Sequence, residues 1–173
     1  MSSLPLEPAL ELLDVVDADD RVIGCAPRGE VHRQGLRHRA AHILVFNLQG
    51  EVFVQRRAWW KECQPGRWDT SAAGHVDAGE TYANAAGREL EEELGIRAGG
   101  DLTLLCHLAA SPQTGNEFVA VYKVVADQTP QPDPHEIIDG RWCTAEALEV
   151  WLAAEPESFT AAFHEIWKRY RQH

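Results

Sequence analysis

The sequence predicts a single α/β domain built in layers, with strands and helices interspersed along the chain. Three observations support this fold class. The chain has 173 residues, a length that suits one domain with a sizeable core. Short apolar runs typical of strands are interspersed with segments of helical periodicity. No repeat or linker divides the chain, so we expect one domain over residues 1–173, with residues 1–11 as a flexible N-terminal extension.

The strands are predicted from apolar runs that end at turn residues. Between the second and third of these runs, residues 28–39 are polar and basic, and we expect them to form a loop with some helix. The turn LQG joins two of the runs, AHILVFN and EVFVQRR, and therefore predicts a hairpin. A proline-rich loop, DQTPQPDPHE, precedes the last run. The expected strands cover residues 12–16, 21–26, 41–47, 51–57, 70–76, 101–110, 116–126 and 137–143.

Three helices are predicted from composition and capping residues. Residues 81–94 lack proline and lie between Thr81, an N-cap residue, and Gly95, a residue that ends helices. Thr144 can cap residues 145–154, and Ser158 or Thr160 can cap residues 161–172. The last segment carries aromatic and aliphatic side chains at helical spacing, which we interpret as core packing: Phe159, Phe163, Ile166, Trp167 and Tyr170.

The net charge of −11 argues against general nucleic-acid binding. Residues 28–67 nevertheless carry eight basic and three acidic side chains, which suggests a local anion site. The chain has no apolar run near the ~20 residues of a membrane span, and its start does not resemble a secretory signal. The four cysteines form no CxxC pair and predict reduced thiols, so we expect a cytoplasmic protein.

Residues 80–93 contain five glutamates. On a helix, Glu89, Glu92 and Glu93 stand at i, i+3 and i+4, so their carboxylates share one face and repel one another. Glutamates in a last helical turn also oppose the helix dipole. A divalent cation removes this conflict, and carboxylate oxygens suit Mg²⁺ or Mn²⁺. Arg88 can pair with a neighbouring carboxylate, for which Glu80 is the candidate.

The same segment resembles the Nudix box, Gly-x5-Glu-x7-Arg-Glu-U-x-Glu-Glu-x-Gly-U, in which U is a bulky aliphatic residue. All nine defined positions are filled: Gly74, Glu80, Arg88, Glu89, Leu90, Glu92, Glu93, Gly95 and Ile96. The flanking runs VFVQRR and EIIDGRW extend the resemblance over most of residues 12–145. The resemblance implies an α/β/α sandwich with a mixed β-sheet and a loop–helix–loop metal site.

The resemblance also implies roles for individual residues. Glu89, Glu92 and Glu93 would bind the metal, the main-chain carbonyl near Gly74 would add a ligand, and Glu80 and Arg88 would support the geometry. Glu136 stands where many relatives place a further ligand or base. The base that takes a proton from the attacking water is Glu92, Glu93 or Glu136, and the sequence does not choose between them.

The implied activity is metal-dependent hydrolysis of a nucleoside di- or triphosphate, or of a related nucleoside diphosphate derivative, to the monophosphate and phosphate or pyrophosphate. Two alternatives compete. The front half also resembles isopentenyl-diphosphate isomerases in LRHRAAHILVFN, VQRR and PGRWDTSAAGHV. Those enzymes carry a catalytic cysteine directly before the box glycine, where this chain has Ala73. The second alternative, a non-catalytic nucleotide-binding domain, conflicts with the retained box carboxylates.

The isomerases also build a second metal site from histidines and a pair of glutamates. His38, His75 and Glu117 match parts of that site, whereas Gly115 replaces the partner glutamate. Val31 stands near another histidine position, for which His32 and Cys106 are conceivable stand-ins. His38 and His42 have i, i+4 spacing within a predicted strand, where that spacing forms no metal site, so we expect both to be surface or packing residues.

The basic stretch is predicted to meet the substrate. Arg56 and Arg57, at the end of a strand, and Arg67, in the following loop, are expected to bind phosphates, because the planar guanidinium suits that role. His75 is a further candidate for substrate contact. Aromatic side chains near the box can stack on a base, although packing is the ordinary role of each: Trp59, Trp60, Trp68 and Tyr82. The expected partner is a small nucleotide, and the sequence leaves the oligomeric state open.

Overall fold

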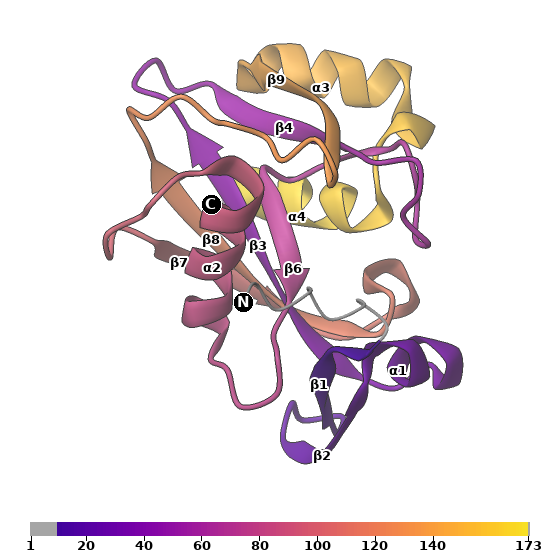
Figure 1. The fold of residues 1–173 in the computed structure, drawn as a ribbon. Helices are drawn as coiled ribbons and strands as arrows, with labels where there is room; N and C mark the ends of the chain where they lie inside the picture. Colours follow the sequence, from indigo (N-terminus) through magenta and orange to yellow (C-terminus); the bar gives the residue numbers. More distant parts are fainter. Residues whose placement is uncertain (1–9, 173) are drawn as a thin grey trace.

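Helices cover both faces of a mixed β-sheet in the computed structural model, which describes residues 10–172 (Figure 1). Most of the expected N-terminal extension therefore lies outside the described residues. Helix α2 (Tyr82–Leu94) packs on one face, and α3 (Ala145–Ala154) and α4 (Ala161–Arg171) pack on the other. The predicted α/β/α arrangement is confirmed. No described helix is long and apolar enough to cross a bilayer.

The main sheet has seven strands, and a separate hairpin of β1 (Leu12–Val16) and β2 (Val22–Pro27) lies at one end beside α1 (Arg28–Gln34). The order β5-β4-β3-β8-β7 forms the body of the sheet, while β6 pairs with β3 and β9 pairs with β4. The strands of this sheet are β3 (His38–Phe46), β4 (Val52–Arg57), β5 (Trp68–Asp69), β6 (Ala72–His75), β7 (Thr103–Leu108), β8 (Glu117–Val125) and β9 (Ile137–Cys143).

Strand β3 lies at the centre and carries alternating side chains to the two faces. Ala41 and Ile43 contact the core under α2, whereas Ala40 and Leu44 contact the core under α4. Strand β8 runs parallel to β3 and places Glu117 beside His38, and β6 runs antiparallel to β3 on its other side. Side chains brought to one face by these registers come from distant parts of the sequence.

The predicted hairpin of β3 and β4 is only partly correct. The two strands are antiparallel, but their register contains a single pair, Phe46 with Val52. Beyond this pair the strands diverge, because the chain after β4 forms β5 against β4 and then β6 against β3. Ser71, between β5 and β6, joins the diverging strands: its hydroxyl accepts from the amide of Val45 and donates to the carbonyl of Phe53.

The predicted helix ends are confirmed. The Thr81 hydroxyl accepts from the amide of Asn84, and Gly95 ends α2 in the left-handed region with φ +66°. Thr144 caps α3, and Thr160, not Ser158, caps α4. The aromatic stripe along α4 packs in the core, as predicted.

Candidate functional site

The C-terminal half of α2 presents its carboxylates to strand β6. Glu93 is buried, and its Oε1 accepts from the amide of Ala73 (3.0 Å) while its Oε2 accepts from Nε2 of Gln55 (3.1 Å). Glu89, one turn earlier, lies against Gly74. Glu92 is more exposed and faces the solvent side of the same group. Two of the three glutamates singled out by their spacing, Glu89 and Glu93, therefore meet beside one short strand, and Glu92 is joined to this group through Arg88.

Gly74 leaves the space that Glu89 occupies. A Cβ atom at position 74 would lie 2.1 Å from Cδ and 2.2 Å from Oε1 of Glu89, far inside van der Waals contact. The φ angle at Gly74 lies outside the left-handed region, so the glycine is required by the close approach and not by its backbone conformation. Any side chain here would displace Glu89.

The guanidinium of Arg88 forms hydrogen bonds with three side chains of the acidic group. Arg88 donates to both oxygens of Glu80 (2.9 Å each), to Oε1 of Glu89 (2.7 Å) and to Oε2 of Glu92 (3.3 Å). It also donates to the carbonyl oxygen of His75 (3.0 Å), which ties α2 to the end of β6. The predicted contact between Arg88 and Glu80 is present. A single positive charge shared among three carboxylates leaves the group strongly acidic.

Burial and the nearby negative charges raise the pKa values of two of these carboxylates, Glu89 and Glu93. Burial, with the charge of Glu93 as a second cause, raises the pKa of Glu89 to about 8. Burial likewise raises the pKa of Glu93 to about 7, against the opposing hydrogen bonds from Ala73 and Gln55. Buried carboxylates that resist ionisation without a cation are a donor set of hard oxygens, which fits Mg²⁺ or Mn²⁺.

These shifts predict how the stability of the metal-free protein depends on pH. Between pH 6.5 and 8.5 the unfolded chain has lost protons that Glu89 and Glu93 retain when folded, so the free energy of unfolding should fall as the pH rises. We expect a fall of about 2–3 kcal/mol, measured by urea unfolding in EDTA. The fall should shrink with saturating Mg²⁺ and in the double variant Glu89→Gln, Glu93→Gln. A metal-free stability that is flat or rising over this interval would contradict the assignment.

Glu136 lies beside the same group, in the loop before β9. Its carboxylate contacts the ammonium of Lys61, and its charge contributes to the raised pKa of Glu93. Lys61 also lies over the ring of Trp60 (4.9 Å to the centroid), and the Trp60 indole donates to the carbonyl of His135. The loop after β4 and the loop before β9 therefore contact each other next to α2.

The predicted phosphate-binding arginines lie around the loop that follows β4. Arg56 donates from Nε to the carbonyl of Gly66 (2.8 Å) and stacks over Trp59 (5.0 Å). Arg57 donates to the carbonyl of Cys63 (3.2 Å) and lies 3.6 Å from a carboxylate oxygen of Asp69. Arg67 is exposed.

The aromatic candidates differ in access. Trp59 and Trp60 are 64% and 46% exposed, but Arg56 lies over the ring of Trp59, and both Lys61 and His135 lie against the ring of Trp60. Trp68 is 5% exposed and packs edge-on against Trp151 in the core under α4, which is the packing role that the sequence left open for it. The hydroxyl of Tyr82 donates to a carboxylate oxygen of Asp20 (2.8 Å).

A second group of ligand-competent side chains lies on the α4-facing side of β3. The ring nitrogens of His32, His38 and His75 lie within 4.8 Å of one another. The nearest Glu117 oxygen, Oε1, lies 3.1 Å from Nε2 of His75 and 3.3 Å from Nε2 of His38. The buried Nε2 of His38 makes no hydrogen bond within residues 10–172. His38 is therefore buried, not at the surface, and its ring belongs to this cluster.

Burial in this cluster favours the neutral forms of His32 and His75. Burial, followed by the proximity of His75 and His38, lowers the pKa of His32 to about 4, and burial also lowers the pKa of His75. Burial acts to raise the pKa of Glu117, but the proximity of His38 and the hydrogen bond with His75 outweigh this and hold it well below its ordinary range. Neutral imidazoles beside an ionised carboxylate are the protonation states that bind metal.

His32 supplies the histidine that appeared to be missing at Val31. Val31, within α1, is fully buried, and the next residue of that helix turns its ring toward His75 of β6. The spacing alone did not settle which of the two faces the cluster, because a helix changes its outward direction by about 100° per residue.

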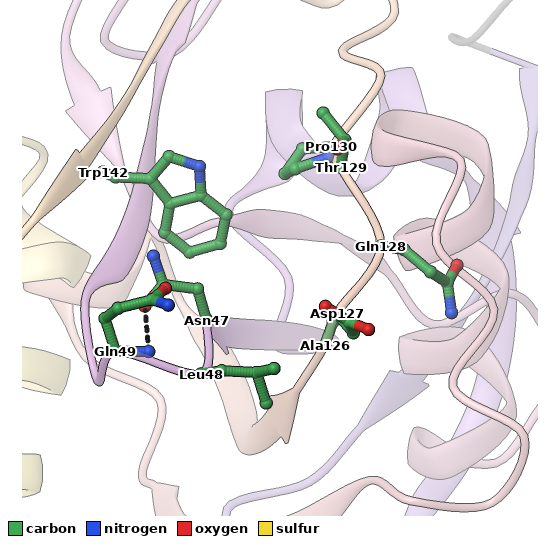
Figure 2. A pocket seen from close by; sticks show the side chains of 9 residues that line it. All are labelled: Asn47, Leu48, Gln49, Ala126, Asp127, Gln128, Thr129, Pro130 and Trp142. Carbon is green, nitrogen blue, oxygen red and sulfur yellow. Dashed lines mark hydrogen bonds between the residues drawn. The ribbon is translucent and has the colours of Figure 1, made fainter.

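The described surface also has a crevice between the β3–β4 turn and the segment after β8. It holds about 190 Å³ and is bounded by the indole of Trp142 and by Leu48, as Figure 2 shows. The amide of Gln49 donates to Oδ1 of Asn47 (3.1 Å) at its rim. None of the predicted site residues lines this crevice, and it has no titratable cluster, so the chemistry does not lie there.

Comparison with known proteins gives a consistent result. The family model described as NUDIX domain matches residues 36–163. An uncharacterized Nudix hydrolase of Pseudomonas aeruginosa is 44% identical over 142 residues, covering 80% of this chain and 82% of that protein. An isopentenyl-diphosphate Delta-isomerase of Serratia proteamaculans is 37% identical over 161 residues, covering 91% and 90%.

Solved structures support the same fold. A crystal structure of a protein from Deinococcus radiodurans superposes with a TM-score of 0.81 and 32% identity, covering 92% of this chain and 98% of that chain. A MutT protein from Methanosarcina mazei superposes with a TM-score of 0.61 at 23% identity, covering 77% and 91%. The second likeness concerns the fold alone.

Proposed function

From the premise that this chain belongs to the Nudix hydrolase family, we propose that it cleaves the phosphoanhydride bond of a nucleoside di- or triphosphate, or of a related nucleoside diphosphate derivative, with Mg²⁺ or Mn²⁺. The products would be the monophosphate and phosphate or pyrophosphate. The observation that carries the proposal is the convergence of Glu89, Glu92 and Glu93 beside Gly74, with two raised carboxyl pKa values.

We assign the metal to Glu89, Glu92 and Glu93, with the main-chain carbonyl of Gly74 as a further ligand. When bound, the ion would lower the pKa of a coordinated water and offset charge on the phosphate oxygens. Arg88 holds Glu80, Glu89 and Glu92 in position through its four carboxylate hydrogen bonds.

The proton of the attacking water requires a carboxylate base, and the candidates remain Glu92, Glu93 and Glu136. In this structure Glu136 is paired with Lys61, so its use as a ligand or base would require that pair to separate. Arg56, Arg57 and Arg67 are proposed to bind the phosphates. The four cysteines are free thiols, which is in keeping with a proposed cytoplasmic location.

The isomerase remains the second candidate, because one observation favours it. The cluster of His32, His38, His75 and Glu117 resembles the isomerases' second metal site, and its nitrogen and oxygen donors suit an ion such as Mn²⁺ or Zn²⁺. Ala73 stands against it, since an alanine neither donates nor accepts a proton. The open backbone of Gly115 offers no second carboxylate.

A substrate screen tests the two candidates together. Purified protein with Mg²⁺ or Mn²⁺ would be offered nucleotides, nucleoside diphosphate derivatives and isopentenyl diphosphate. Released phosphate and pyrophosphate would be measured, and proton NMR would detect the dimethylallyl isomer. We expect metal-dependent release from at least one nucleotide derivative and no isomer. Formation of the isomer without hydrolysis would overturn the proposal.

Replacing Arg57 with alanine tests the phosphate site. We expect KM to rise about tenfold with little change in kcat, because the lost charge-assisted hydrogen bond serves substrate binding. Steady-state kinetics with the best substrate from the screen would measure it. Arg171→Ala is the matched control, since Arg171 pairs with Glu149 at the far end of α4. Unchanged kinetics in Arg57→Ala would remove this residue from the site.

A further inference from the structure

An ion pair joins two loops at the edge of the acidic group. Lys61, in the loop after β4, contacts Oε2 of Glu136, in the loop before β9. The main chain also holds these loops together, because the amide of Ala58 donates to the carbonyl of Glu136 (3.1 Å). The side chains of Lys61 and Glu136 are 17% and 28% exposed, so both are accessible to a ligand while solvent and salt screen their charges only in part.

This ion pair lies close to Glu93, one of the proposed metal ligands. The amide of Asp133 donates to the carbonyl of Glu93 at the end of α2 (2.9 Å), and the amide of Glu136 donates to the carbonyl of Asp133 (3.0 Å). Burial is the main cause of the raised pKa of Glu93, but the charges of Lys61 and Glu136 also act on it, in opposite directions. A phosphate held by a metal ion at Glu93 would therefore lie near the ammonium of Lys61.

Each partner keeps bonding capacity that the other does not use. An ammonium can donate three hydrogen bonds. Within residues 10–172, the ammonium of Lys61 donates only to Glu136, and its other contact is the ring of Trp60, 4.9 Å to the centroid. Oε1 of Glu136 accepts no hydrogen bond from the described residues. Lys61 can therefore donate to a further anion, and Glu136 can accept from a water molecule.

The pair nevertheless limits Glu136 as a base, because a carboxylate bonded to an ammonium is a weaker proton acceptor than a free one. A diphosphate changes this balance. Its oxygens offer Lys61 more negative charge than one carboxylate does, and lysine binds phosphate as a point charge. Arg88 contacts other carboxylates of the acidic group, so it can stay on Glu80 and Glu89 while Lys61 moves.

We propose that Lys61 moves from Glu136 to a phosphate oxygen of the substrate, and that Glu136 then accepts the proton of the attacking water. The inference rests on the proposed function, since it assumes that a phosphate is held beside Glu93. The oxygen of the water would bond to phosphorus, its proton would pass to Glu136, and the bridging oxygen would leave with the electron pair of the broken P–O bond. The substrate itself would thus release the base, which stays paired in the free protein.

Binding of methylenediphosphonate with Mg²⁺ tests this exchange without a nucleotide, because the probe resists hydrolysis. Titration calorimetry would compare wild type with three variants. We expect Lys61→Met to bind the probe about tenfold more weakly, and Glu136→Gln to bind it about threefold more tightly, because Lys61 no longer has to leave a carboxylate. Lys61→Arg, which keeps the charge, should bind nearly as wild type. Weaker or unchanged binding in Glu136→Gln would overturn the proposal.

A second ion pair near the end of α2 supplies matched controls. Arg97 pairs with Glu91, and both are exposed, so this pair carries the same charges outside the site. Arg97→Met and Glu91→Gln should bind the probe as wild type, which separates the local exchange from the general charge of the protein. Glu136→Gln should also lower kcat about 100-fold with the best substrate from the screen. Tighter phosphate binding with slower turnover is a combination that a purely structural ion pair would not give, and a near-normal kcat would refute Glu136 as the base.

Nitrogen NMR of the side-chain ammonium groups follows the exchange directly. The chain has three lysines, so Lys123 and Lys168 serve as internal controls. The Lys61 signals of wild type and Glu136→Gln should differ before the probe is added and coincide when it is bound, because Lys61 then contacts phosphate in both proteins. Signals that stay apart, or a wild-type Lys61 signal that the probe does not move, would overturn the exchange.

The outcomes separate this inference from the proposed function. Hydrolysis of a nucleotide derivative with an unmoved Lys61 signal refutes the exchange alone. A Lys61 signal that moves as expected, with no nucleotide derivative hydrolysed, refutes the proposed function and the role of Glu136 as a base, and leaves the phosphate contact of Lys61 standing. Failure of the probe to bind with Mg²⁺ overturns the exchange, whatever the screen finds.

Discussion

Replacing Glu93 with glutamine is expected to reduce kcat by about two to three orders of magnitude, because it removes a negative charge from the centre of the metal site. Glu93 is buried between Ala73 and Gln55, and its carboxylate faces Glu89. The fold should survive, because the substitution keeps the shape of the side chain and removes an ionisation that the metal-free protein resists. Turnover and thermal unfolding, with and without Mg²⁺, would be measured together.

The helix supplies its own control for this variant. Glu91 lies between the site residues in sequence but is exposed and pairs with Arg97. Glu91→Gln should therefore retain near-normal turnover, whereas Glu92→Gln should fall with Glu93→Gln. Near-normal rates in both Glu92→Gln and Glu93→Gln would refute the metal assignment. An equal loss in Glu91→Gln would indicate that general charge, not ligation, is responsible.

Replacing Gly74 with alanine is expected to lower kcat about 100-fold without changing any charge. The new methyl group would fall on the carboxyl carbon of Glu89, and the flexible end of that side chain would have to leave the site. Because the clash is with a side chain and not with backbone, the protein should remain folded. Mg²⁺ affinity, measured by calorimetry, should fall together with turnover.

Gly87 offers the comparison for this substitution. It lies within α2, and a Cβ atom at that position would meet nothing within 4 Å. Gly87→Ala should keep full activity and raise the free energy of unfolding by about 0.5–1 kcal/mol, since alanine favours a helix over glycine. Wild-type Mg²⁺ affinity in Gly74→Ala would show that Glu89 is not held where the structure places it.

Local signals in the sequence were sufficient to predict the positions of most helices and strands. The caps Thr81 and Gly95, the apolar runs and the stripe on α4 each depend on residues close together in the chain, and the structure agrees with them. The pairing of β3 with β4 was overestimated, because the departure of β6 from that hairpin is decided by Ser71 and by the two cores. Strand pairings of this long-range kind cannot be predicted from a short stretch of sequence.

The same distinction between local signals and long-range pairing applies to the candidate site. The acidic face of α2 follows from helical spacing, so its convergence could be predicted. The histidine cluster could not, because His32, His75 and Glu117 meet only through the pairing of β3 with β6 and β8. The burial of Trp68 could not be predicted for a related reason: aromatic composition near the box does not reveal which ring packs in the core.

The parallel register that sets Glu117 beside His38 joins two strands that lie far apart in the sequence, and it leads us to expect an order of events during folding. Closing so long an intervening loop is slow compared with forming the local helices and turns. A chain that has already made α2 therefore holds its acidic face while the histidine cluster still lacks its carboxylate. The complete cluster should consequently form last in a refolding experiment, in step with the burial of the central strand.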